Sequence, residues 1–119
     1  MDIKIIESAT RKIALCNSTD IIIKDGQSAL DLVATIGYEY ECHHIIINKS
    51  AICEDFFNLS TRIAGDVAQK FVNYGIRFAI IGDFSNYNSK SLNDYIYECN
   101  ELGPLYFVSD ENEALNKLT

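Results

Sequence analysis

The apolar residues between positions 59 and 73 recur at helical spacing. Each has another apolar residue three or four positions away, which is the pattern of a helix with one buried face. These positions are Leu59, Ile63, Ala64, Val67, Ala68, Phe71 and Val72. Gly75 follows them and can adopt the left-handed conformation that ends a helix. The pattern predicts a long amphipathic helix that begins near Leu59 and ends at Gly75.

Three short runs are apolar at nearly every position, which is typical of strands buried on both faces. Residues 44–47 read HIII, residues 78–81 read FAII and residues 105–108 read LYFV. Strands of this kind belong to parallel sheets that helices cover. The second half of the chain is therefore predicted to form a parallel sheet.

The beginning of the chain has a different pattern. Residues 3–7 and 12–16 look like two strands joined by the turn SATR at 8–11, which predicts an N-terminal hairpin. The three isoleucines at 21–23 either extend this hairpin or form a short third strand.

Three more helices are predicted from capping residues that precede apolar positions. The capping sequences are Ser28 with Asp31, Ser91 with Asp94, and SDE at 109–111. The first of these helices is expected to end at Gly37 and the second at Gly103. With right-handed crossovers, the order of elements predicts one α/β domain over residues 1–119, built on a single mixed, partly parallel sheet with helices.

Composition and charge narrow the function. The chain has 119 residues, 48% of them hydrophobic, and a single proline, which opposes disorder. Its formal net charge of -7 would repel a phosphate backbone, so nucleic acid is not an expected partner. The sequence has no signal-peptide pattern and no apolar run of membrane-spanning length, so we expect a cytoplasmic protein that does not enter membranes. The cysteines lack CxxC spacing and are expected to be reduced and mostly buried. They are Cys16, Cys42, Cys53 and Cys99.

Polar residues lie at the ends of three successive predicted strands. They are Asn48, Asp83 and Ser109. Because the carboxyl ends of strands in an open α/β sheet form the usual ligand crevice, these groups could converge on one small molecule. The alternative, which we favour, is that each caps a helix or orders its loop.

Aromatic residues surround the same strand ends, and those that are exposed would form a patch for self-association or for a partner. They are Phe56, Phe57, Phe84, Tyr87, Tyr95 and Tyr97. His43 and His44 lie beside Cys42 but, as neighbours in a strand, point to opposite faces. We therefore expect no metal site, and the chain has no motif that predicts a cofactor or a catalytic residue.

The run FFNLSTRIAGDVAQKFVNYGIRFAIIGDFSNYNSKSLNDYIYECN, followed by FVSDENEAL, resembles the bacterial family called domain of unknown function 4180. That resemblance implies a family but no established activity. The order of elements is also similar to the STAS fold of anti-sigma-factor antagonists, in which a Ser or Thr at a helix start can be phosphorylated. This second resemblance places the acceptor at Ser60 or Thr61. The usual STAS segment is aspartate, serine, serine, glycine, whereas Arg62 follows Thr61 in this chain.

A phosphoryl group on Ser60 or Thr61 would sit against free N–H groups of the helix start, although capping alone also explains either residue, and we favour capping. The first functional hypothesis is a non-enzymatic regulatory or interaction module of STAS-like fold. It would contact a protein partner or a second copy through residues 56–61 and 83–87. The competing hypothesis is a small-molecule binder or enzyme that uses the crevice at the strand ends. A deep pocket with a perturbed Asp83 would favour the second hypothesis, and a flat surface the first.

Overall fold

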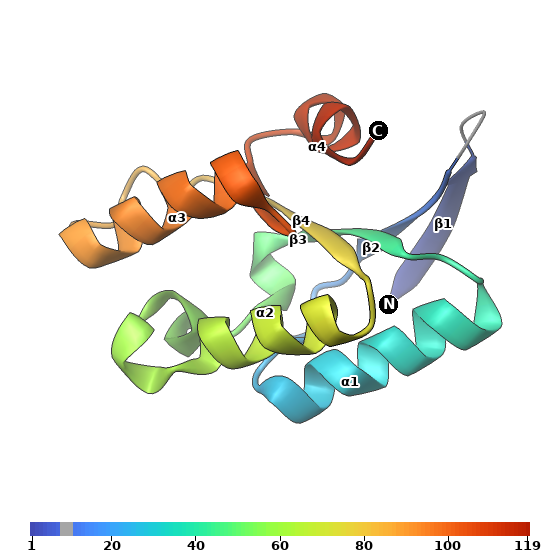
Figure 1. Ribbon diagram of the computed structural model, residues 1–119, viewed down its shortest axis with the longest axis horizontal. Helices are drawn as coiled ribbons and strands as arrows, with labels where there is room; N and C mark the ends of the chain where they lie inside the picture. Colours follow the sequence, from blue (N-terminus) through green and yellow to red (C-terminus); the bar gives the residue numbers. More distant parts are fainter. Residues whose placement is uncertain (8–10) are drawn as a thin grey trace.

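The computed structural model describes residues 1–7 and 11–119. Its centre is one five-stranded sheet, in which the strands lie side by side in chain order (Figure 1). The strands are β1 (Asp2–Glu7), β2 (Lys12–Asn17), β3 (His44–Asn48), β4 (Arg77–Ile81) and β5 (Leu105–Val108). β1 and β2 are antiparallel and every later pair is parallel. The structure therefore confirms a mixed, partly parallel sheet. The turn expected between β1 and β2 falls largely on residues outside the described part of the chain.

Helices cover both faces of the sheet, as the apolar strands require. The helices are α1 (Gly26–Ala34), α2 (Ile63–Asn73), α3 (Lys90–Leu102) and α4 (Glu111–Leu118). α1, α2 and α3 bury one face of the sheet, whereas α4 packs on the other (Figure 1). On the first face, the ring of Phe71 from α2 stacks on that of Phe78 from β4 with centroids 4.4 Å apart. On the second face, Leu118 of α4 is fully buried.

The end of α2 agrees with the prediction from Gly75. This glycine has a φ of 68°, and its N–H donates to the carbonyl of Val72. The N–H of Ile76 donates to the carbonyl of Phe71, which completes a Schellman motif. The beginning of α2 differs from the prediction, because residues 59–61 form a separate 3₁₀ turn (η4, Leu59–Thr61) and the helix starts at Ile63. Arg62 between them is left-handed, with a φ of 65°, which breaks the helical path.

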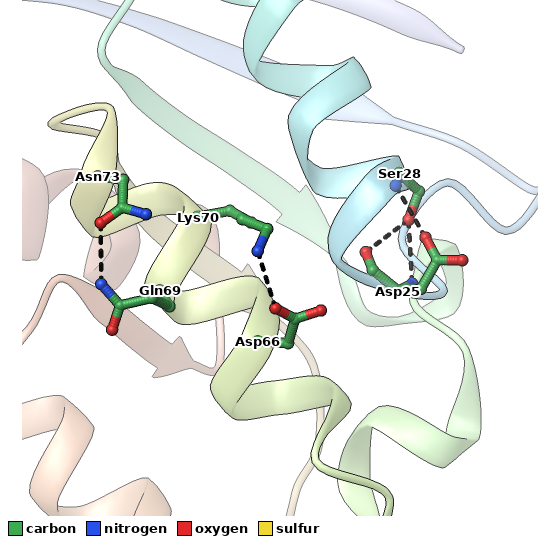
Figure 2. A network of polar contacts seen from close by, with 6 residues as sticks. All are labelled: Asp25, Ser28, Asp66, Gln69, Lys70 and Asn73. Atoms are coloured by element: carbon green, nitrogen blue, oxygen red, sulfur yellow. Dashed lines mark hydrogen bonds and ion pairs between the residues drawn. The ribbon is translucent and has the colours of Figure 1, made fainter.

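The first helix begins earlier than expected, and the helical path continues beyond Gly37. Asp25 caps it, and Ser28 returns the hydrogen bond to the cap, so the box lies one turn before the predicted pair of Ser28 with Asp31. Gly37 does not end the helix, because the chain continues through it as a π-helix, η1 (Thr35–Glu39). Figure 2 shows the Asp25–Ser28 cap near Asp66 of α2, a carboxylate that also pairs with Lys70 at 3.0 Å.

Two further expectations are wrong. Residues 21–23 do not form a strand of the sheet, since only Ile23 makes a β-bridge, with Ile52. The cap of α3 is Ser89, whose hydroxyl accepts from the N–H of Leu92, rather than Ser91. Ile23 and Leu92 are both buried in the core.

Candidate functional site

Two neighbouring hollows lie at the carboxyl ends of the parallel strands. The first has a volume of about 570 Å³ and the second about 460 Å³, and Gly82 and Asp83 line both. Asn48, Lys49, Glu54 and Asn86 contribute to the first hollow, and Phe84, Phe107, Ser109 and Glu113 contribute to the second. We call the surface around the two hollows the carboxyl-end face. It brings Asn48 and Asp83 to one hollow, and Asp83 and Ser109 to the other.

Asn48 ties β3 to the segment that follows β2. Its Oδ1 accepts from the N–H of Ser18 at 3.0 Å, and its Nδ2 donates to the carbonyl of Ser18 at 2.8 Å. Nδ2 also donates to the hydroxyl of Ser50. Because Ser18 is buried, the side-chain amide of Asn48 supplies the hydrogen-bond partners of the Ser18 N–H and carbonyl.

Asp83 is exposed and engaged with its own loop. Its Oδ1 accepts from the N–H of Ser85 at 2.9 Å and from the Ser85 hydroxyl at 2.6 Å. These hydrogen bonds, the hydroxyl's first, lower the pKa of the Asp83 carboxyl, so the group is ionised at neutral pH. A lowered carboxyl pKa does not suit a general acid, which needs a raised one.

Ser109 and Asp110 precede α4, and Asp110 caps it. The hydroxyl of Ser109 donates to Oε2 of Glu113 at 2.8 Å, while the carboxylate of Asp110 accepts from the N–H of Glu113. Together with Asn48 and Asp83, Ser109 therefore has a local partner. Throughout residues 1–7 and 11–119, every buried side-chain nitrogen or oxygen has a hydrogen-bond partner.

Lys49 is the residue of this face that the sequence analysis missed. Its Nζ lies 4.8 Å from the ring centroid of Tyr87 and 5.4 Å from that of Phe57. An ammonium over aromatic rings is attracted by their negative faces. The Tyr87 hydroxyl donates to Oε1 of Glu54 at 2.9 Å, and burial raises the pKa of this phenol. The sequence signal that could have identified Lys49 is its position directly after a buried strand.

Gly82 allows Lys49 to reach these rings. A Cβ at position 82 would lie 2.6 Å from Cβ of Lys49 and 2.9 Å from its Cδ. Both distances are far below ordinary contact, so only glycine lets the lysine stem cross the end of β4.

The aromatic residues form the floor of the carboxyl-end face rather than an exposed patch. Phe56 and Phe57 are buried, whereas Phe84 and Tyr87 are half-buried above them. The rings of Phe57 and Tyr87 stack at 5.3 Å, and those of Phe84 and Phe107 meet edge to face at 5.2 Å. Tyr95 packs against Phe107 with a centroid distance of 6.4 Å, and Tyr97 is 68% exposed on α3. The floor is thus a contiguous aromatic cluster.

Ser60 and Thr61 lie in η4, beside the aromatic floor. The hydroxyl of Ser60 donates to Oδ1 of Asn58 at 2.7 Å. The hydroxyl of Thr61 lies 2.8 Å from the carbonyls of both Asp55 and Asn58, and it accepts from the N–H of Ile63. Both residues are exposed, and Thr61 holds together the turns that precede α2.

His43 precedes β3 and is exposed, whereas His44 is the first residue of the strand and is half-buried. Nε2 of His44 is 3.0 Å from a guanidinium nitrogen of Arg11, and burial, followed by Arg11 and Arg77, lowers the pKa of His44. Within the described residues, no group of three or more His, Cys, Asp or Glu side chains is arranged to hold a metal ion.

Comparison with known proteins adds a family. A sequence model described as Domain of unknown function (DUF4180) matches residues 8–118. Neither the curated proteins nor the solved structures contain a match. None of the helices in the described part of the chain combines the length and the apolar character needed to cross a bilayer.

Proposed function

Because the chain belongs to the family described as Domain of unknown function (DUF4180), whose description names no activity, we propose a function from the carboxyl-end face. The protein is a non-enzymatic regulatory or protein-interaction module of STAS-like fold in the bacterial cytoplasm. Its carboxyl-end face binds a protein partner.

The observation that carries this proposal is the open shape of the face, together with the hydrogen bonds that its polar side chains already make within the protein. Both hollows are broad and open to solvent, whereas sites for small ligands usually enclose most of the ligand surface. Both polar atoms of Asn48, one carboxylate oxygen of Asp83 and the hydroxyl of Ser109 already form hydrogen bonds within the protein. An open surface with a rigid aromatic floor is suited to a protein segment, because aromatic residues are enriched at such interfaces.

The charges of the face define the partner further. Glu54, Asp83 and Glu113 line the two hollows and outnumber Lys49, whose ammonium lies over the ring of Tyr87. A complementary partner therefore presents Lys or Arg to the carboxylates and an apolar residue to the aromatic floor. The net charge of -7 would speed the approach of such a basic segment.

Phosphorylation of Thr61 would regulate this face. A phosphate removes the hydroxyl proton that Thr61 donates toward the carbonyls of Asp55 and Asn58. The loss would release η3 (Glu54–Phe57), which carries Glu54 and Phe57 of the face. Ser60 is the second acceptor, and its phosphate would break only the contact with Asn58.

Site-specific photocrosslinking in the source bacterium tests the proposal. A benzoylphenylalanine at Asn86, on the exposed rim of the first hollow, is expected to yield a discrete protein adduct, either with another protein or with a second copy. The same probe at Tyr97, on the outer side of α3, is the control and should give none. Thr61→Glu and Thr61→Ala both remove the hydroxyl that donates to Asp55 and Asn58, so each should reduce the Asn86 adduct, whereas Ser60→Ala should retain it. No adduct at Asn86, or equal adducts at both positions, would contradict the proposed docking surface.

The second candidate function is small-molecule binding or catalysis at the same face. It is favoured by one observation, that Asp83 shares one hollow with Asn48 and the other with Ser109. On this account, Asp83→Asn would remove a co-purifying metabolite and leave protein adducts at Asn86 absent or unchanged.

A further inference from the structure

A third hollow lies at the opposite end of the sheet, where the parallel strands begin. Its volume is about 200 Å³, and its walls come from the last turns of α1 and α2 and from the residues that enter β3 and β4. The lining residues are Val33, Gly37, Tyr38, His43, Tyr74 and Ile76. This volume is smaller than that of typical drug-sized sites, so it suits a group of only a few heavy atoms.

Two tyrosines of this hollow are held out of the core. Tyr38 is 87% exposed and Tyr74 is 57% exposed, although Ile36 and Ile76, each two positions away along the chain, are buried. Tyr38 lies in the π-helix η1, an irregularity that occurs frequently at functional sites. Tyr38 lies two positions after Ile36, the last buried residue along α1 and η1.

The electrostatic environment of the hollow is negative. Both α2 and the α1–η1 helix end at it, and the aligned peptide dipoles of a helix give its carboxyl end a partial negative charge. Glu39 and Glu41 add two exposed carboxylates to the segment that forms one wall. The end of η1 already accepts one ammonium group, since Nζ of Lys12 lies 3.4 Å from the carbonyl of Tyr40.

The guanidinium of Arg77 is engaged on the other face of the sheet. Arg77 follows Ile76, but its side chain donates to the hydroxyl of Tyr106 at 2.7 Å and to the carbonyl of Lys117 at 2.9 Å. Both partners belong to the layer on the α4 side of the sheet. No Lys or Arg lines the hollow.

We propose that this hollow, which Tyr38 and Tyr74 line, binds the alkylated ammonium head group of a small organic cation. Ring faces attract a desolvated ammonium, and quaternary ammonium groups are commonly recognised by aromatic side chains. The apolar walls from Val33 and Ile76 contact the alkyl groups, while the two helix ends and the nearby carboxylates favour the positive charge. The site is distinct from the carboxyl-end face and does not depend on the function proposed for it.

An NMR titration with choline chloride tests the proposal. Amide signals of Gly37, Tyr38, His43 and Tyr74 should shift saturably, in the millimolar range that a site of about 4 kcal/mol provides. The neutral isostere 3,3-dimethyl-1-butanol, and sodium chloride at equal ionic strength, are the ligand controls and should leave these signals in place. Equal shifts with choline and with its neutral isostere would show apolar contact without charge recognition, and would overturn the proposal, as would unsaturable shifts.

Four variants separate the ring contribution from general surface effects. Tyr38→Leu should weaken choline binding by about 2- to 5-fold, the effect of one exposed cation–π contact, and Tyr38→Phe should retain it. Tyr97→Ala removes an exposed tyrosine elsewhere and should change nothing. Gly37→Leu should abolish binding, because the space above Gly37 is open and the new side chain would fill the hollow. Equal affinity in Tyr38→Leu and the wild type would refute the role of the rings.

Discussion

Replacement of Gly82 by alanine is the sharpest test of how the sheet supports the carboxyl-end face. A Cβ at this position would lie 2.6 Å from Cβ of Lys49, where ordinary contacts are 3.4–4 Å. Rotation of the lysine side chain cannot relieve this overlap, because its Cβ is fixed by the backbone. The ends of β3 and β4 must therefore move apart.

The expected magnitude follows from two opposing effects. Overpacking of a tight site costs about 1–3 kcal/mol. Gly82 lies outside the left-handed region, so alanine also stabilises the fold by about 0.4–1 kcal/mol through the unfolded state. Gly82→Ala should therefore lower the free energy of unfolding by about 1–2 kcal/mol. The ammonium of Lys49 should also leave the rings, which would alter the aromatic NMR signals of Tyr87.

Urea denaturation measures this change, and an unchanged slope of the transition shows that the shift in midpoint reports stability. The matched control is Gly65→Ala, because Gly65 lies in α2 with nothing within 4 Å of an added Cβ. That substitution should raise the free energy of unfolding by about 0.5–1 kcal/mol. The Gly82→Ala penalty should persist largely in a Lys49→Ala background, which keeps the Cβ. A Gly82→Ala protein as stable as the wild type would refute the close-packing argument.

Three other perturbations probe the core, the thiols and the turn before α2. Phe71→Ala should lower the free energy of unfolding by about 3–5 kcal/mol in a denaturant titration, because the Phe71 ring is buried against Phe78. Val72→Ala, at a position that is 52% exposed, should cost close to nothing. Similar losses for both would mean that the buried face of α2 is misplaced. Thiol labelling without denaturant at pH 8 should spare Cys16, because burial raises the pKa of this thiol to about 11 and the thiolate is the reactive form. Prompt labelling of all four cysteines would disprove this prediction. Thr61→Ala should lower the free energy of unfolding by about 0.5–1.5 kcal/mol, because the hydrogen bonds of the Thr61 hydroxyl are lost. Thr61→Glu should remain folded. Unfolding of Thr61→Glu in a thermal melt would rule out this variant as a mimic of phosphorylation.

Periodicity predicted the elements of this fold better than their ends. The strands β3, β4 and β5 were found because each is apolar on both faces, a pattern that little else produces. Helix starts were less certain, because Asp25, Ser28 and Asp31 are spaced so that each could begin the same helix. Asp25 prevails because its carboxylate accepts from the N–H of Ser28, and Ser28 returns the bond.

The candidate site was predicted only in part for a related reason. The rule that polar residues gather after parallel strands located Asn48, Asp83 and Ser109 at one end of the sheet. It did not single out Lys49, because the value of this residue depends on rings from positions 57, 84 and 87 that meet only after folding. The hollow between Tyr38 and Tyr74 was equally hidden, since a π-helix has no reliable sequence pattern.

The central claim is that the carboxyl-end face binds a protein rather than a metabolite. Native mass spectrometry of the protein purified gently from its own cells, followed by denaturing extraction, measures both kinds of ligand at once. We predict a complex with a basic protein partner that is lost in Asp83→Lys and retained in Glu98→Lys, a matched charge reversal at an exposed position of α3. We also predict that denaturation releases no small molecule whose amount depends on Asp83. One equivalent of a metabolite that is present in the wild type and missing from Asp83→Lys, without any protein complex, would contradict the central claim.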